Sequence, residues 1–147
     1  IPSLTIIGSG PEESKLHQQV KELNLSNQVD FVGVKVDKKL AKLLNAHQIL
    51  VVPSRWREPF GVVALEGIAC GCVVIGSEEG GLKEAIGPCG MTFPNGDVKA
   101  LTYTLVDLLT NPEKRAIYRT QAKTHLSRHK KEEVAKAYLQ VFKEAIQ

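Results

Sequence analysis

Four short segments of mostly apolar residues recur along the chain, and each is followed at once by glycine or proline and then by residues with helical spacing. The segments are Leu4–Ile7, Val29–Val32, Ile49–Val52 and Cys72–Ile75. All four are predicted strands, and the uninterrupted apolar runs Ile49–Val52 and Cys72–Ile75 are typical of buried strands of a parallel sheet. Strands that alternate with helices predict an α/β fold, in which helices cover both faces of a mostly parallel sheet.

The predicted helices lie between and after these strands. One starts after Pro59, ends at Gly71, and is expected to turn Phe60 and Leu65 toward the core. The others are predicted at 12–23, 38–47, around Glu84, and at 98–109, 112–125 and 132–146, with Asp37, Asp97 and Asn111 as N-caps. A short edge strand is expected at Gly90–Phe93, before a Pro-Asn-Gly-Asp turn.

The segment between the third strand and its helix is the best candidate for a ligand site. The carboxyl end of a strand and the amino end of a helix meet there, which is where open α/β sheets bind their ligands. A helix start offers free N–H groups and a partial positive charge. This combination favours an anion.

Two glutamates frame this helix start. Glu58 lies just before the helix, and Glu66 lies about two turns into it, with a rise of roughly 12 Å over eight helical residues. Helical side chains tilt toward the amino end, so Glu66 can reach toward the loop. Two carboxylates around a group of N–H donors suit a nucleotide-sugar, with ribose, diphosphate and hexose in line. The alternative is a surface helix with an acidic residue in its first turn, which needs no ligand.

These residues belong to a longer sequence pattern. It consists of Glu58-Pro-Phe-Gly, Leu65-Glu66, Ala69-Cys-Gly71, Val73–Ser77 and Gly80-Gly81-x-x-Glu84. The pattern resembles the signature of family 4 retaining glycosyltransferases of the GT-B type, which have two Rossmann-like domains. The resemblance covers most of the chain from Leu4 onward. It departs from the family at Cys72, where the family often has proline.

The resemblance implies roles for the residues around the central helix. Glu58 would be the catalytic residue that contacts the transferred sugar, and Glu66 would bind the ribose. The backbone between them would lie against the sugar and the diphosphate, at Phe60, Gly61, Val62 and Val63.

The resemblance also implies ligand contacts nearer the start of the chain. Gly8 would line the donor pocket, and Val34 and Lys35 would contact the nucleobase, largely through backbone groups. From the residues alone, Gly8 is also explained by a tight turn between strand and helix, and Lys35 by an ordinary exposed lysine.

The domain assignment combines the length with the resemblance. The 147 residues fit one domain, and the chain begins with Ile1. We therefore expect a single nucleotide-sugar-binding domain over 1–147, the Rossmann-like C-terminal half of a GT-B fold. It would be a fragment that lacks its first βα unit and the N-terminal, acceptor-binding domain. In the family, an arginine and a lysine upstream of Leu4 grip the diphosphate, so we expect this chain alone to be inactive and to bind a nucleoside diphosphate only weakly.

Composition and charge bear on partners and location. Three cysteines cannot all pair, which favours a reducing, cytoplasmic compartment. Residues 1–110 have ten Lys or Arg against twelve Asp or Glu, whereas residues 111–147 have nine against four. The basic run Arg128–Lys131 has no interleaved aromatic residues, which argues against nucleic-acid binding. An ordinary solvated helix face explains it first, and a peripheral contact with an anionic membrane surface second.

The sequence offers little support for a metal cofactor. Cys70-Gly-Cys72 has no second group of ligands at a suitable spacing, and His125 and His129 lie among lysines and arginines without a nearby carboxylate pair. An Asp-x-Asp motif is absent from the sequence. We therefore expect a metal-independent protein, as the resemblance to GT-B glycosyltransferases also implies. The resemblance further implies a UDP-sugar as the donor substrate, because UDP is common in that family, and ADP and GDP remain open.

Two further interpretations stand beside the principal one. The principal hypothesis is a UDP-hexose-binding domain of a retaining glycosyltransferase that acts on a glycan or lipid-linked acceptor, in polysaccharide or glycolipid synthesis. A catalytically inactive nucleotide-sensing or partner-docking module would keep Glu66 and the helix start without depending on Glu58. A membrane adaptor would depend on the basic tail instead.

Overall fold

A computed structural model describes residues 2–146 of the chain. The chain divides into two compact units, Ile1–Lys42 and Leu43–Gln147, and each contains its own parallel sheet. The boundary between the units lies within helix α2 (Asp37–Asn45).

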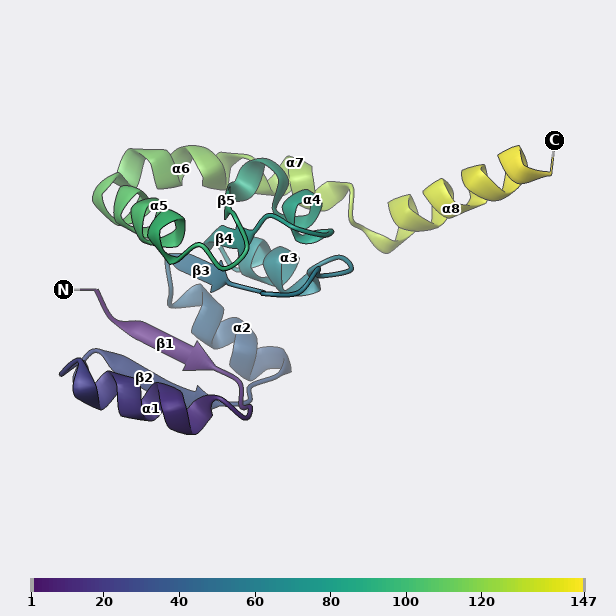
Figure 1. The fold of residues 1–147 in the computed structure, drawn as a ribbon. Helices are drawn as coiled ribbons and strands as arrows, with labels where there is room; N and C mark the ends of the chain where they lie inside the picture. Colours follow the sequence, from purple (N-terminus) through teal and green to yellow (C-terminus); the bar gives the residue numbers. More distant parts are fainter. Residues whose placement is uncertain (1, 147) are drawn as a thin grey trace. The chain divides into compact units, whose positions relative to one another are not determined.

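The first unit consists of a strand, a helix and a second strand (Figure 1). Strands β1 (Leu4–Ile7) and β2 (Val29–Gly33) pair in parallel, with an irregularity in register between Ile6 and Ile7. Helix α1 (Glu13–Glu22) packs on this sheet, and its His17 ring stacks on Phe31 of β2 with the ring centroids 3.9 Å apart.

The second unit is built around a three-stranded parallel sheet. Strands β3 (Ile49–Val52), β4 (Val73–Ser77) and β5 (Gly90–Phe93) lie in the order β3-β4-β5, and every residue of the central strand β4 is buried. The connections contain α3 (Val62–Ala69), α4 (Leu82–Ile86) and the 3-10 helix η1 (Gly87–Cys89). The C-terminal helices are α5 (Val98–Thr110), α6 (Pro112–Thr120), α7 (Ala122–Ser127) and α8 (Lys131–Ala145).

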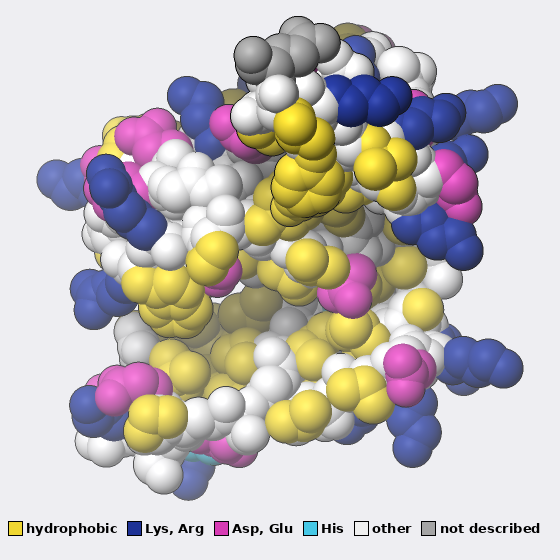
Figure 2. All heavy atoms as spheres, turned by 90° about the vertical axis from the view of Figure 1, so that its right-hand side faces the viewer, with side chains coloured by type: hydrophobic (Ala, Val, Ile, Leu, Met, Phe, Trp, Pro, Cys, Tyr) yellow, Lys and Arg dark blue, Asp and Glu magenta, His cyan; other side chains and the backbone are white. Residues whose placement is uncertain are grey.

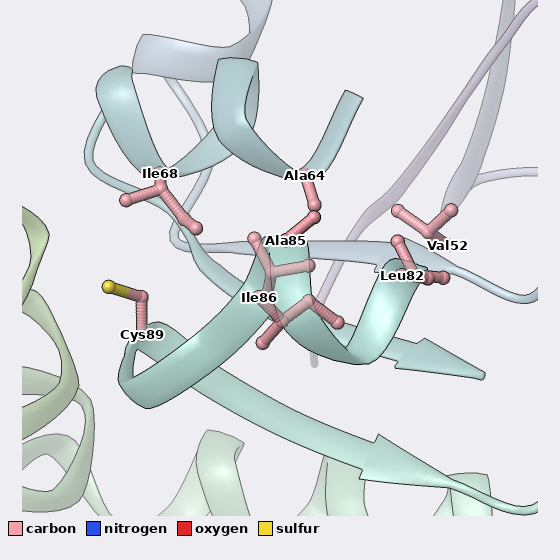
Figure 3. Packing of buried hydrophobic residues seen from close by; sticks show 8 residues of the cluster. Val52, Ala64, Ile68, Leu82, Ala85, Ile86 and Cys89 are labelled. Carbon is pink, nitrogen blue, oxygen red and sulfur yellow. The ribbon is translucent and has the colours of Figure 1, made fainter. Parts of the chain in front are cut away.

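Each face of this sheet has its own apolar core. On one face, buried side chains of β3 and β4 pack against α3, α4 and η1, as Figure 3 shows for Ile68, Leu82 and Ile86. On the other face, Val73 and Ile75 pack with Leu108 of α5 and with Phe93. Burial of one such aliphatic side chain contributes about 1.5–3 kcal/mol. The predicted α/β fold, with parallel strands and helices on both faces, is confirmed.

The four predicted strands and the edge strand occur where the sequence places them. The predicted helix 112–125 is wrong as one continuous helix, because the chain forms α6 and α7 with Gln121 between them. Asn111 is also not a side-chain cap for α6, since its amide donates to the Asp107 carbonyl oxygen at 2.8 Å. Asp97 does cap α5, through a 2.9 Å hydrogen bond from the Ala100 N–H. Asp37 is the first residue of α2, with φ at +50°.

Candidate functional site

Glu58 lies in the loop that joins β3 to α3, and its carboxylate is held from within that loop. Ser54 is 6% exposed, and its Oγ donates a 2.8 Å hydrogen bond to Oε1 of Glu58. The Glu58 side chain is half-buried. A carboxylate oriented at the carboxyl end of a parallel strand can accept hydrogen bonds from the hydroxyls of a ligand.

The loop that joins β4 to α4 lies directly against Glu58 through its main chain. The Gly81 N–H donates to the Glu58 carbonyl oxygen at 2.7 Å, and Glu58 and Gly80 form an isolated parallel bridge. A Cβ on Gly80 would lie 2.4 Å from the Glu58 carbonyl oxygen, and a Cβ on Gly81 would lie 2.3 Å from that of Pro59. The double glycine therefore permits an approach that a side chain at either position would block.

Asn95, in the loop between β5 and α5, joins these two loops. Its Nδ2 donates to the Ser54 carbonyl oxygen at 3.1 Å, and its Oδ1 accepts from the Glu79 N–H at 3.0 Å. The loops that follow all three strands of the sheet are thus connected by hydrogen bonds around Glu58. The sequence analysis assigned no role to Ser54 and treated Asn95 only as a turn residue.

The amino end of α3 follows immediately after this loop. Gly61 precedes the helix with φ at +90°, and no side chain caps it. Four consecutive backbone N–H groups at this helix start donate to no acceptor within residues 2–146, at Phe60, Gly61, Val62 and Val63. Free N–H groups at a helix start form a binding site for an anion such as a phosphate.

The two glutamates differ in their surroundings. Glu58 is half-buried and fixed by Ser54, whereas Glu66 is exposed on the second turn of α3. Neither carboxylate is sealed in the core. The ligand roles that the family resemblance implies for them remain predictions.

Phe60 does not face the core, so that prediction is wrong. Its side chain is 37% exposed, and its ring lies against His129 at a centroid distance of 5.7 Å. His129 in turn lies against His125, with the centroids 4.9 Å apart, and the buried His125 Nε2 bonds to the Ala85 carbonyl oxygen at 2.7 Å. Leu65 packs against the core as predicted.

The surroundings of His129 disfavour its charged form. Burial is the main cause that lowers the pKa of His129, and the neighbouring His125 and Arg128 lower it further. Because His129 contacts Phe60, this titratable ring lies beside the helix start that carries the free N–H groups.

The remaining predicted site residues lie in the first unit. Gly8 follows β1 with φ at +125°, and its N–H donates to the Gly33 carbonyl oxygen at 3.0 Å, which places it beside the end of β2. Val34 is 64% exposed, and Lys35 donates through Nζ to the Val32 carbonyl oxygen. Their predicted contacts with a nucleotide remain predictions.

The cysteine at the departure from the family pattern is a structural residue. Cys72 is buried, and its Sγ donates to the Leu44 carbonyl oxygen at 3.2 Å. Burial, with a smaller effect of Cys70, raises the pKa of the Cys72 thiol to about 11. Such a thiol stays protonated and unreactive at neutral pH.

A family model identifies the chain. Residues 2–125 match the model described as "Glycosyl transferases group 1". The chain belongs to this family. The resemblance to family 4 glycosyltransferases of the GT-B type, which we inferred from the motifs around Glu58, is thereby confirmed.

The group 1 glycosyltransferase domain has curated relatives of known name. It is 36% identical over 112 residues to the N-acetyl-alpha-D-glucosaminyl L-malate synthase of Bacillus anthracis, across 75% of this chain and 29% of that protein. It is 33% identical over 130 residues to a GDP-mannose-dependent monoacylated alpha-(1-6)-phosphatidylinositol monomannoside mannosyltransferase of Corynebacterium glutamicum, across 84% of this chain and 34% of that protein. The domain thus spans about a third of the length of these relatives.

Solved structures of similar proteins contain the same fold as this chain. The sucrose-phosphate synthase of Thermosynechococcus elongatus matches with a TM-score of 0.82 and 30% identity, over 98% of this chain and 38% of that chain. The Anabaena protein HepE in complex with UDP-glucose matches with a TM-score of 0.74 and 25% identity, over 83% and 35% of the two chains.

The basic C-terminal part of the chain, beyond the residues that match the family model, contains an amphipathic helix. Helix α8 exposes apolar side chains such as Tyr138 and Phe142, and Figure 2, in which α8 faces the viewer, shows apolar side chains there beside Lys and Arg side chains. Among the described residues, no helix combines the length and the apolar character needed to cross a bilayer.

Proposed function

We propose that the chain is the donor-binding domain of a retaining glycosyltransferase, which transfers a hexosyl group from a nucleotide-sugar to a hydroxyl of a glycan or lipid-linked acceptor. The observation that carries the proposal is the arrangement at the start of α3. The carboxylate of Glu58 is fixed by Ser54, and the free N–H groups of 60–63 follow it directly.

The proposed chemistry uses these two features together. Glu58 accepts hydrogen bonds from the hydroxyls of the transferred sugar and so fixes the orientation of its anomeric carbon. The N–H groups of Phe60 to Val63 stabilise the negative charge that develops on the diphosphate as it leaves. Stabilisation of this kind requires donors that are already in place before the reaction, and the start of a helix that is packed on the sheet provides them. Glu66 binds the ribose.

We propose UDP as the nucleotide and retention as the stereochemical outcome. The structural relative HepE is described in complex with UDP-glucose, which supports the choice of UDP. The relative from Corynebacterium glutamicum is named as GDP-mannose-dependent, so GDP must be compared directly.

The first test measures nucleotide choice and stereochemistry in the full-length protein. Isothermal titration with UDP, GDP and ADP should give the tightest binding for UDP. The anomeric configuration of the product, followed by proton NMR from the start of the reaction, should match that of the donor. Inversion of the configuration would contradict the proposed mechanism.

The second test separates the enzyme from a nucleotide-sensing or docking module. Glu58→Ala and Glu66→Ala should each lower turnover strongly in an enzyme, and Glu66→Ala should also weaken nucleotide binding. Glu113→Ala, which removes an exposed carboxylate from the first turn of α6, is the matched control. Nucleotide binding without turnover in the unmodified protein, unaffected by Glu58→Ala, would favour the module.

A further inference from the structure

Two side chains outside the proposed ligand contacts form a continuous hydrogen-bonded connection to Glu58. Asn95 donates to the carbonyl oxygen of Ser54 at 3.1 Å, and the hydroxyl of Ser54 donates to Oε1 of Glu58 at 2.8 Å. Resting on the proposed function, we infer that Ser54 and Asn95 are positioning residues that fix the Glu58 carboxylate for the transferred sugar.

The hydroxyl of Ser54 has few alternatives to this contact. A serine hydroxyl carries one hydrogen, and here it is donated to a carboxylate, which makes a charge-assisted hydrogen bond. Ser54 is 6% exposed, so water competes little for this hydrogen. Donation from a buried hydroxyl to one named oxygen restricts rotation of the Glu58 carboxylate.

The second oxygen of Glu58 is left for a ligand. Within the described part of the chain, no hydrogen bond reaches Oε2 of Glu58, whereas Oε1 is bonded to Ser54. Since Glu58 is half-buried and not sealed, Oε2 can accept a hydrogen bond from a sugar hydroxyl. The two carboxylate oxygens thus have separate tasks, one toward the protein and one toward the donor sugar.

The orientation of the Asn95 amide follows from its partners. The Glu79 N–H can only donate, so it requires Oδ1, and the Ser54 carbonyl oxygen can only accept, so it requires Nδ2. Asn95 therefore fixes the distance between the backbone of Ser54 and the loop that contains Glu79, Gly80 and Gly81. Neither aspartate nor leucine of similar size can satisfy both partners.

A main-chain contact between the loops after β3 and β4 also fixes Glu58. The Gly81 N–H donates to the Glu58 carbonyl oxygen at 2.7 Å, so the backbone of Glu58 is fixed by one loop and its side chain by Ser54. Asn95 joins both points of attachment through Glu79 and Ser54. Loss of Asn95 removes the two side-chain hydrogen bonds between these loops and leaves the Gly81–Glu58 contact in place.

The experiment compares sugar recognition with nucleotide recognition in the full-length protein. Calorimetry measures the affinities for UDP-glucose and UDP, and for GDP-mannose and GDP, and the pair that the unmodified protein binds is then used for each variant. Ser54→Ala should leave the affinity for the nucleotide unchanged and reduce the preference for the nucleotide-sugar, with turnover lowered about ten- to hundredfold. Asn95→Asp should give a smaller loss in the same direction.

A double-mutant cycle tests whether Ser54 acts through Glu58. In a Glu58→Ala background, Ser54→Ala should have no further effect on turnover, because its partner is already gone. Ser54→Thr, which keeps the hydroxyl, should retain more turnover than Ser54→Ala. Ser127→Ala, which removes an exposed hydroxyl bonded to Thr124, is the control and should match the unmodified protein.

The outcomes separate this inference from the proposed function. Equal losses from Ser54→Ala in the presence and absence of Glu58, or a loss of nucleotide affinity that matches the loss for the nucleotide-sugar, would overturn the positioning role. Thermal unfolding of each variant identifies a loss of turnover that is due to unfolding. If Ser54→Ala is unfolded, the turnover of Ser54→Thr, which keeps the hydroxyl, tests the positioning role instead. If neither pair binds, or if Glu58→Ala does not change turnover, the proposed function fails and the inference fails with it.

Discussion

Replacement of Gly81 by alanine tests whether the loop after β4 must touch the backbone of Glu58. Gly81 has φ of −78° and ψ of −8°, which alanine adopts without strain, so only the added methyl group matters. That methyl would lie 2.3 Å from the Pro59 carbonyl oxygen and 2.8 Å from the Phe60 Cα. Both contacts are with backbone, which cannot rotate away as a flexible side chain can.

The size of the effect follows from these distances. Ordinary contact requires about 3.5 Å, so the two loops must separate by about 1 Å. The 2.7 Å hydrogen bond from the Gly81 N–H to the Glu58 carbonyl oxygen then exceeds the usual limit of about 3.2 Å. Overpacking of this kind typically costs about 1–3 kcal/mol of stability. A displacement of about 1 Å at a catalytic group can lower turnover about a hundredfold.

Gly71→Ala provides the matched control for this variant. Gly71 has φ at +86° with open space around its Cβ position, so alanine there suffers backbone strain without a clash. The strain should cost about 1–2 kcal/mol of stability, while turnover at temperatures below unfolding stays unchanged. Turnover and thermal unfolding are measured on both variants of the full-length protein. If Gly81→Ala retains turnover within about threefold of the unmodified protein, then Glu58 does not depend on this loop contact.

Three further predictions concern stability. Leu82→Ala should lower the free energy of unfolding by about 2–5 kcal/mol because Leu82 is fully buried, and chemical denaturation should show a much smaller loss for the half-exposed Leu109→Ala. The hydrogen bond from Lys114 is the main cause that lowers the pKa of Asp107. The stability that this interaction contributes is therefore complete above the ordinary carboxyl pKa and is lost as the pH falls through the lowered value. The destabilisation by Lys114→Met should accordingly vanish when unfolding is measured at acidic pH. Burial lowers the pKa of His129; the unfolded chain therefore takes up this proton first, and stability should fall as the pH drops through about 6.5 until folded His129 is protonated too. His129→Gln should show a shallower pH dependence in unfolding measured from pH 7.5 to 5, and an unchanged slope would contradict the assignment.

The strands were predictable because their signal is local. A run such as Val73–Ile75 is apolar at every position, and the glycine that follows it permits the turn into the next loop. The capping role of Asp97 is equally local, since its partner Ala100 is three residues away. The succession of strand, loop and helix then identified the loop of Glu58 and the start of α3 as the candidate site, and the family motifs supported it.

The supports of the site could not be predicted in this way. Asn95 bonds to Ser54 across 41 positions of sequence, and only the folded sheet brings their loops together. Phe60 was expected to face the core, but its ring lies against His129, which is 69 positions later in the sequence. The break at Gln121 has no glycine or proline to mark it.

The contact between the loops after β3 and β4 is made by main-chain atoms of Glu58 and Gly81, and this has a practical consequence for protein engineering. The tripeptide Arg55-Trp56-Arg57 precedes Glu58 in the same loop, and its side chains are exposed, with Trp56 65% accessible. Libraries that randomise Arg55 and Trp56 change the chemistry presented next to the carboxylate while the backbone that carries it keeps its attachment. Arg57 is best left in place, because its Nε pairs with Oε2 of Glu79 in the neighbouring loop at 3.7 Å.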